Sequence, residues 1–192
     1  MNKINELLAI LGSPRRGGNT EILLDALIKG AELEGAKIDK VILSELCIKP
    51  CIECGGCAIA GECVLEDDMQ KIYSKLLSAN AVIIASPIFF YSITATAKAF
   101  VDRGQALWSR KYILNRAPFT LQERRGYFLS VGATKGKRLF EGAALTMKYF
   151  FDAIDAVYSG ELLFSGIEKK GEIINHPSAM NEAREFGRKI AL

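Results

Sequence analysis

Four cysteines crowd into one short segment of this chain, in the pattern Cys51-x2-Cys54-x2-Cys57-x5-Cys63. A loop this short rarely offers the Cα separation and Cβ direction that two unstrained disulfides require. Closely spaced thiolates suit soft metals instead, and a Cys-x2-Cys-x2-Cys run with a fourth cysteine from elsewhere is typical of [4Fe-4S] ligands. With Cys63 as the fourth ligand, the spacing favours an iron-sulfur cluster.

Two other chemistries remain open for these thiols. Zinc sites more often pair two Cys-x2-Cys or Cys/His knuckles across a longer spacer, which this segment lacks. The cysteines can also stay free or become reversibly oxidised. A fifth cysteine, Cys47, stands outside the pattern, and we interpret it as an apolar residue at a strand end.

The composition predicts one domain spanning residues 1–192, with the cysteine cluster in segment 47–63. Of the 192 residues, 49% are hydrophobic and 24% charged, which is enough to bury one ordinary core. The N-terminal residues are charged, and the apolar run after them is too short for a signal peptide or a membrane span, so we expect a cytoplasmic protein with no membrane partner. The net charge of +3 is small and evenly spread, and we expect no nucleic-acid partner.

Apolar runs alternate with helical patterns along the chain. This rhythm predicts an α/β fold: a flavodoxin-like, doubly wound, five-stranded parallel sheet of order 2-1-3-4-5, with the cysteine-rich loop after strand 2. Ligands of such sheets bind outside the carboxyl ends of the strands, between strands one and three. We expect strands at 7–11, 37–43, 81–86, 126–131 and 157–164, helices at 20–34, 67–79, 94–107, 139–154 and 178–192, and an irregular stretch at 108–123 that is a lid or a dimer surface.

The loop after the first strand has the composition of a phosphate cradle. Its glycines let the backbone approach an anion, and the N-terminus of the next helix attracts one. It lacks the Gly-Lys-Ser/Thr ending of a Walker loop and the Gly-x-Gly-x-x-Gly spacing of a dinucleotide fold. A polar turn with a threonine cap is the simpler alternative. The candidate phosphate ligands are Ser13, Arg15, Gly18, Asn19 and Thr20, with Arg16 as an alternative source of charge.

The loop after the third strand displays an aromatic run where a buried strand ends. A flat ring system edged by aromatic side chains gives these residues a role, and a flavin with one phosphate matches the first loop. The same aromatics can instead pack under a neighbouring loop or a second subunit. The fourth such loop adds small residues and a positive charge, with Lys135 facing a reduced flavin or simply solvent. The candidate FMN contacts are Pro87, Ile88, Phe89, Phe90, Tyr91 and Ser92, followed by Ala133, Thr134 and Lys135.

Three segments together carry a family resemblance over nearly the whole chain: 12–20, 85–92 and the cysteine motif. They resemble the iron-sulfur flavoprotein family, within the NAD(P)H-dependent FMN reductase group. The resemblance implies a homodimer or homotetramer with FMN and one [4Fe-4S] cluster per subunit, ligated by Cys51, Cys54, Cys57 and Cys63. It also implies electron transfer from a ferredoxin-like one-electron donor or NAD(P)H to an acceptor. Because the cluster loop follows an edge strand, we expect the cluster to lie nearer a neighbouring subunit's flavin than its own.

The residues give less support to other functions. The main alternative is an NAD(P)H-dependent FMN or quinone reductase that keeps its cysteines as thiols, and a second is a non-enzymatic redox or zinc-binding adaptor. A hydrolase is disfavoured because the only histidine, His176, is read as a surface loop residue and no Gly-x-Ser-x-Gly elbow exists. Asp67 and Asp68 are interpreted as a cap and a dipole partner of a helix, and no catalytic acid or base is predicted.

Overall fold

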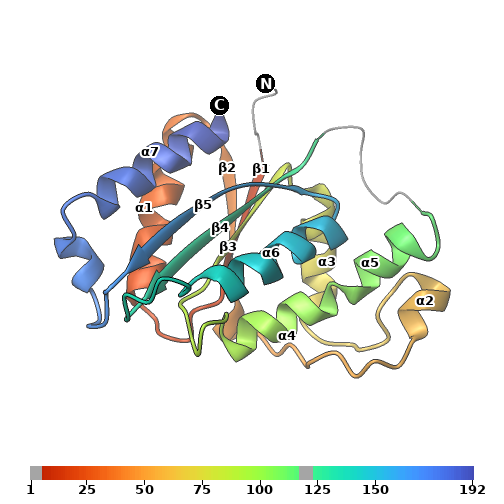
Figure 1. Cartoon of the computed structure of the whole chain (residues 1–192). Helices are drawn as coiled ribbons and strands as arrows, with labels where there is room; N and C mark the ends of the chain where they lie inside the picture. The colour runs from red at the N-terminus through yellow and green to blue at the C-terminus, as the bar shows by residue number, and fades with distance from the viewer. Residues whose placement is uncertain (1–5, 117–122) are drawn as a thin grey trace.

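The sheet of this protein is fully parallel. A computed structural model describes residues 6–116 and 123–192. Five strands run in the order β2-β1-β3-β4-β5, and each neighbouring pair is parallel (Figure 1). The flavodoxin-like order predicted from the sequence is therefore confirmed. The strands are β1 (Glu6–Leu11), β2 (Lys37–Ile42), β3 (Ala81–Ala85), β4 (Arg125–Gly132) and β5 (Val157–Ser165).

Helices cover both faces of the sheet. In Figure 1, α1 and α7 lie on one face, while α3, α4 and α6 lie on the other. Every residue of β3 is buried, which explains why its sequence is continuously apolar rather than alternating. The helices are α1 (Asn19–Leu33), α2 (Gly56–Ala60), α3 (Met69–Ser78), α4 (Ala95–Arg103), α5 (Gln105–Tyr112), α6 (Glu141–Ala153) and α7 (Ala179–Ala191), with short 3-10 turns η1 (Leu43–Glu45) and η2 (Glu172–Asn175).

The region after α4 differs from the prediction. The sequence predicted one helix over 94–107 and an irregular stretch over 108–123, but the structure has a break at Gly104 and a second helix, α5, that continues to Tyr112. A Cβ at Gly104 would lie 2.8 Å from the Val101 carbonyl oxygen and 3.0 Å from the Phe150 ring, so the close packing on α6 requires glycine at the break. Residues 117–122 of the predicted stretch lie outside the described residues.

The cysteine-rich loop follows β2, as predicted, and contains the short helix α2 (Figure 1). The interpretation of Cys47 as an apolar strand-end residue is wrong. Strand β2 ends at Ile42, and Cys47 is exposed in the coil beyond η1, where its backbone N–H donates to the Asp68 carboxylate at 2.9 Å. In the described ranges, no helix is both long and apolar enough to cross a bilayer.

Candidate functional sites

A cavity of about 510 Å³ lies at the carboxyl edge of the sheet, where the loops after β1, β3, β4 and β5 meet. We call it the flavin cleft, after the ligand that the sequence predicts there. It brings together most of the residues predicted from the first and third loops and one from the fourth. From the predicted set it is lined by Ser13, Arg15, Gly18, Asn19, Thr20, Pro87, Ile88, Phe89 and Ala133; the sequence reasoning missed Pro14, Val131, Ile167 and Glu168. Ile167 and Glu168 follow β5. Their position after a parallel strand could have identified them as site residues from the sequence.

The first loop offers a hydroxyl to the flavin cleft. Thr20, at the start of α1, is only 2% exposed, and its hydroxyl has no hydrogen-bond partner among the described residues. Ser13, 4% exposed, already accepts the backbone N–H of Arg15 at 3.2 Å. The Asn19 side chain is engaged too, because its amide donates to the Lys169 carbonyl at 2.9 Å. Thr20 therefore has the more available hydrogen-bonding group at the N-terminus of α1.

A buried carboxylate, Glu21, holds the first loop in shape. It accepts the backbone N–H of Gly17 at 2.6 Å and forms ion pairs with Arg16 at 3.0 Å and Lys40 at 3.2 Å. Burial acts to raise the pKa of Glu21, but the hydrogen bonds from Gly17, Arg16 and Lys40 outweigh it and hold the pKa below its ordinary range. Since Arg16 also pairs with Glu45, the structure leaves Arg15 as the arginine that lines the cleft.

The third loop forms a tight hairpin turn. Phe89 and Ser92 exchange both backbone hydrogen bonds, at 2.9 and 3.0 Å, around Phe90 and Tyr91. Phe90 has a φ of 49° and Tyr91 a φ of 61°, which is the left-handed region that bulky residues avoid at a cost of about 1–2 kcal/mol each. Phe90 is fully exposed at the tip. Strain and exposure concentrated on one loop are typical of a functional turn.

Several predicted flavin contacts lie outside the cleft lining. The lining does not include Phe90, Tyr91 and Ser92 of the hairpin or Thr134 and Lys135 of the fourth loop. Their contacts run between loops. A Cβ added at Gly136 would lie 2.8 Å from the Tyr91 hydroxyl, and one added at Gly166 would lie 2.6 Å from the Lys135 Cε. The third, fourth and fifth loops thus support one another around the cleft.

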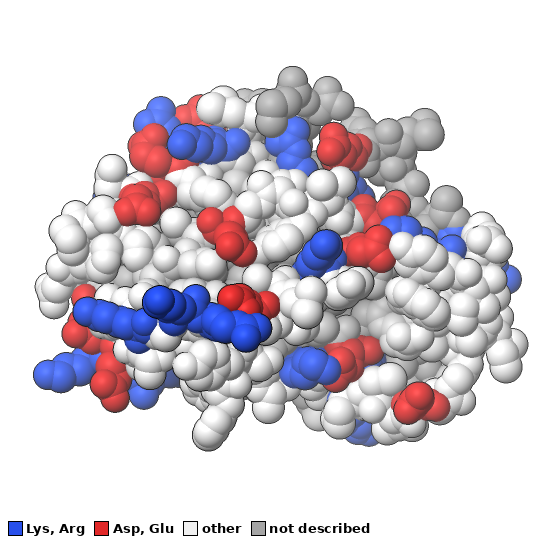
Figure 2. All heavy atoms as spheres, viewed as in Figure 1, with Lys and Arg blue, Asp and Glu red and all other residues white. Residues whose placement is uncertain are grey.

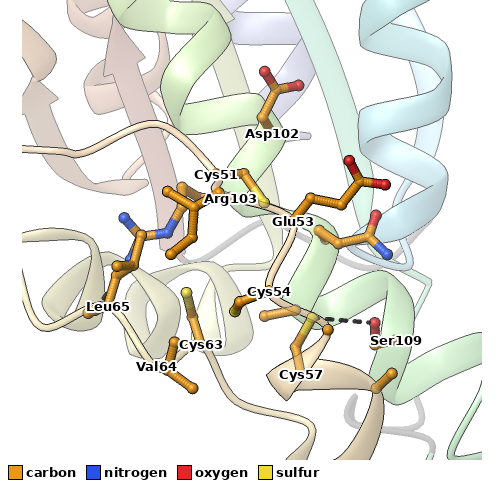
Figure 3. Close-up of a pocket in the computed structure, with 15 residues that line it drawn as sticks. Cys51, Glu53, Cys54, Cys57, Cys63, Val64, Leu65, Asp102, Arg103 and Ser109 are labelled. Atoms are coloured by element: carbon orange, nitrogen blue, oxygen red, sulfur yellow. Dashed lines mark hydrogen bonds between the residues drawn. The ribbon is translucent and has the colours of Figure 1, made fainter.

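A second cavity, of about 570 Å³, is lined by all four cysteines of the motif (Figure 3). We call it the cysteine pocket. Cys51 and Cys54 are exposed, while Cys57 and Cys63 are half-buried. Helices α4 and α5 supply the other wall. The structure therefore places the four predicted cysteines around one cavity, although within the described residues no three His, Cys, Asp or Glu side chains are close enough to hold one metal ion.

Left-handed turns bend the cysteine segment around its pocket. Glu53, Gly55 and Gly61 have φ values of 51°, 73° and 77°. Nothing lies within 4 Å of a Cβ added at Gly55, so glycine serves there for its backbone conformation rather than for space. Gly55 and Gly61 flank α2 and lie between the second and fourth cysteines.

One buried arginine fastens both ends of this segment. Arg103, 1% exposed at the end of α4, donates to the Lys49 carbonyl at 2.9 Å and to the Leu65 carbonyl at 3.2 Å. Its counter-ion is Asp67, at 2.6 Å, whose side chain is 2% exposed. Asp67 also accepts the Met69 backbone N–H at 3.0 Å, which agrees with its predicted capping role. The sequence did not reveal this ion pair, because its two residues are 36 positions apart.

The pKa values of two side chains near Arg103, Asp67 and Tyr73, are shifted from their ordinary values. Burial acts to raise the pKa of Asp67, but the hydrogen bonds from Arg103 and from the Lys49 and Met69 amides outweigh it and lower the pKa. Burial, followed by the nearby Cys63 sulfur, raises the pKa of Tyr73 far above its usual value. The Nε of Arg103 is buried and has no hydrogen-bond partner within the described residues.

His176 is not a simple surface residue. It is half-buried, its ring meets Phe164 edge-on at 5.0 Å, and its Nδ1 accepts the backbone N–H of Ala179 at 3.2 Å. It therefore caps the N-terminus of α7. Nothing in these contacts gives it a catalytic role.

A parallel sheet of order 2-1-3-4-5, with a cleft at its carboxyl edge, defines the flavodoxin-like class of folds. Within this class, residues 5–164 match the family model described as NADPH-dependent FMN reductase. The chain belongs to that family. The expected family resemblance is thereby confirmed.

Curated relatives and solved structures agree with this placement. An iron-sulfur flavoprotein of Archaeoglobus fulgidus is 43% identical over 96 residues, which are 50% of this chain and 44% of the relative. One from Methanosarcina thermophila is 35% identical over 130 residues, 68% of this chain and 64% of the relative. The matches thus span roughly half to two thirds of those relatives' lengths. The structure of an NAD(P)H:quinone oxidoreductase from Methanothermobacter marburgensis superposes with a TM-score of 0.74 at 16% identity, covering 98% of this chain and 100% of that one, and shows likeness of fold alone.

Proposed function

We propose that this protein is a redox flavoprotein that binds FMN in the flavin cleft and a [4Fe-4S] cluster on Cys51, Cys54, Cys57 and Cys63. It transfers electrons between a ferredoxin-like one-electron donor and an acceptor. The observation that carries this proposal is that all four cysteines line a single cavity of about 570 Å³. When bound, the cluster would pass single electrons and the flavin would hold one or two.

The softness and spacing of the four thiols, rather than a preformed ion site, support a polynuclear cluster over zinc in the cysteine pocket. Zinc requires four ligands about 2.3 Å from one point. Among residues 6–116 and 123–192, no three His, Cys, Asp or Glu side chains are placed to hold one metal ion. The cavity that the four cysteines line has a volume of about 570 Å³, which leaves room for more than one metal atom. Four thiols around so wide a space suit a cluster whose iron atoms each take one cysteine.

The flavin cleft fits a phosphate at one end and a ring system at the other. Thr20 supplies a hydroxyl at the N-terminus of α1, where the helix dipole favours an anion, and Arg15 supplies charge. Phe89 and Ile88 supply apolar surface for the rings. Figure 2 shows Lys and Arg side chains gathered near the ends of β4 and β5, which favours anionic ligands at this edge. The protein's part is to bind and orient the flavin and to limit its contact with water.

The two cavities share no lining residue, which supports separate sites for the cluster and the flavin within one subunit. Apolar side chains are exposed near the cysteines, with Ile52 at 61%, Ile59 at 82% and Val64 at 57%. Exposed apolar patches mark interaction surfaces. We therefore propose a homodimer or homotetramer in which the cluster of one subunit faces the flavin of a neighbour.

The alternative is an FMN or quinone reductase that uses NAD(P)H directly and carries free thiols. The description of the family supports it, since NADPH is the electron donor that the description names. Lysines near the flavin cleft are compatible with a phosphorylated nicotinamide cofactor as well as with FMN. The two functions differ in what the cysteine pocket holds.

Anaerobic purification followed by assay of FMN, iron and acid-labile sulfide separates these functions. The proposal expects one FMN and ~4 iron and ~4 sulfide per chain, and faster flavin reduction by a low-potential one-electron donor than by NAD(P)H. FMN without iron, with rapid reduction by NAD(P)H, supports the reductase. Stoichiometric zinc, or the absence of any flavin, supports the adaptor function instead.

A further inference from the structure

Ser109 stands out among the residues around the cysteine pocket. It lies on α5, is 0% exposed, and its hydroxyl donates to the Cys57 sulfur at 3.4 Å (Figure 3). The two residues are 52 positions apart in the chain, so the fold brings them together. Nothing in the local sequence pattern distinguishes Ser109 from an ordinary helix residue.

The direction of this hydrogen bond is unusual for a buried helical serine. Such serines commonly donate to the backbone carbonyl one turn earlier in their own helix. In the described part of the chain, the Ser109 hydroxyl makes its hydrogen bond to the thiol instead. Alanine would fill the site without burying a polar group, and a buried hydroxyl costs stability unless it is hydrogen-bonded. The serine therefore serves the sulfur rather than the packing of the helix.

Helix α5 is fixed in place, so this donor is held rather than free to adjust. Lys111 forms ion pairs with Asp152 and Asp155 of the α6 region, each at 3.2 Å. The Tyr112 hydroxyl also donates to the Asp152 carboxylate, at 2.8 Å. These contacts fasten the last turn of α5 to a helix that packs on the central sheet. A pre-positioned donor costs little additional entropy when it bonds to its acceptor.

The strength of this hydrogen bond depends on whether Cys57 is a neutral thiol or a metal-bound thiolate. A neutral thiol is a weak acceptor, whereas a metal-bound thiolate carries negative charge and takes a stronger, charge-assisted hydrogen bond. Hydrogen bonds to ligand sulfurs stabilise the more negative, reduced form of an iron-sulfur cluster and thereby raise its reduction potential. A hydroxyl aimed at one of four cysteine sulfurs has this effect only if that sulfur is a ligand.

We propose that Ser109 is a positioning residue that raises the reduction potential of the cluster through its hydrogen bond to Cys57. This inference rests on the proposed function, because it requires a cluster on the four cysteines. Ser109 itself contacts no metal. Its hydroxyl sets how easily the centre accepts an electron and thus how favourable the next transfer to the flavin is.

The test compares three variants of the anaerobically purified holoprotein by redox titration followed by electron paramagnetic resonance. At an ambient potential equal to the wild-type midpoint, we expect Ser109→Ala to lower the ratio of reduced to oxidised cluster about tenfold, equivalent to ~59 mV for a one-electron couple. Ser109→Thr keeps the hydroxyl and is expected to retain the wild-type midpoint. Ser74→Ala removes an exposed helical hydroxyl whose hydrogen bond within the described ranges goes to the Lys71 carbonyl, and it is the matched control.

Two further measurements keep the result decisive. Iron and sulfide content shows whether each variant keeps its cluster, and urea unfolding of the iron-free proteins shows whether Ser109→Ala harms the fold alone. An unshifted midpoint in Ser109→Ala, or an equal shift in Ser109→Thr, overturns the inference while leaving the proposed function intact. If Ser109→Ala is purified without its cluster, it is reconstituted anaerobically with iron and sulfide and its midpoint is measured then; failure of reconstitution overturns the inference too, because the serine would then hold the cluster rather than set its potential. A wild-type protein without iron and sulfide overturns both.

Discussion

The flavin cleft and the cysteine pocket are built by different means. The cleft is formed by loops that directly follow buried parallel strands, so the sheet itself sets its shape. The pocket lies in a long connection between β2 and α3, whose only regular structure among the described residues beyond η1 is the five-residue helix α2. The sheet topology thus sets the position of the first site, whereas the position of the second depends more on specific side chains.

Each site is organised around one buried carboxylate, and the two carboxylates differ in their partners. Glu21 holds the first flavin loop through Arg16, whose side chain is 51% exposed, and Lys40, at 25%. Asp67 holds the cysteine segment through Arg103, and both side chains are almost completely inaccessible. Removing one partner of a buried ion pair costs far more stability than removing one partner of an exposed pair. The cysteine pocket should therefore be the more easily destroyed of the two sites.

Removing the four thiols is expected to abolish iron binding while leaving FMN binding intact. Replacing Cys51, Cys54, Cys57 and Cys63 together with alanine should reduce bound iron from ~4 per chain to none, while FMN binding persists because no cysteine lines the flavin cleft. Metal analysis and the flavin absorption spectrum measure both. The control is Cys47→Ala, which should retain iron. Iron retained in the fourfold variant would contradict the ligand assignment.

Breaking the Arg103–Asp67 ion pair should be the next largest effect. Arg103→Met leaves the Asp67 carboxylate buried without its counter-ion and releases both ends of the cysteine segment. We expect a loss of about 3–5 kcal/mol in the free energy of unfolding, together with loss of iron, as measured by urea denaturation and metal analysis.

The same helix offers a control for that variant. Lys98 pairs with Asp102 on the surface of α4, where the two side chains are 49% and 41% exposed. Lys98→Met should change stability by less than about 0.5 kcal/mol and leave iron unchanged. Similar losses in the two variants would show that the buried pair has no special role.

The contrast between the two sites also explains what sequence could reveal. Strand order and the cleft were predictable because apolar runs such as 81–85 and the polar residues after them follow local rules. The spacing of the four cysteines likewise pointed to the one cavity that they line. Arg103 and Ser109 were not predictable, because each acts on a residue more than 30 positions away and looks like an ordinary helix residue. The prediction of an irregular stretch from residue 108 was wrong for a similar reason. Helix α5 is stabilised by packing against α2 and α6 rather than by a strong helical pattern in its own sequence.

Within the flavin cleft, Thr20→Val should weaken FMN binding without unfolding the loop. Valine keeps the volume of threonine but removes a hydroxyl that has no protein partner in the described residues. Losing one hydrogen bond to a phosphate corresponds to about 1.4 kcal/mol, or a tenfold higher Kd. Fluorescence titration of the deflavinated protein with FMN measures it.

The control for this change lies on α6. Thr146 donates to the Gly142 carbonyl of its own helix and lines neither cavity. Thr146→Val should therefore leave the Kd for FMN unchanged. An unchanged Kd in Thr20→Val as well would remove Thr20 from the phosphate site, though not the cleft from consideration.

The smallest expected effect is the pH dependence that Glu21 confers. Its pKa is lower in the folded protein than in the unfolded chain, because the hydrogen bonds from Gly17, Arg16 and Lys40 overcome the effect of burial. The stability that it contributes is therefore present above the ordinary glutamate pKa of ~4.3 and is lost as pH falls through the lower folded value.

Comparing wild type with Glu21→Gln isolates this contribution. The difference between their free energies of unfolding, from urea denaturation at a series of pH values, should be constant near neutrality and shrink as the pH falls below ~4.3. FMN affinity should decline over the same range, since the loop that Glu21 holds lines the flavin cleft while the cysteine pocket has its own carboxylate. A difference that does not change with pH would show that Glu21 stabilises the loop by shape alone, and the parallel drawn between Glu21 and Asp67 would then be wrong.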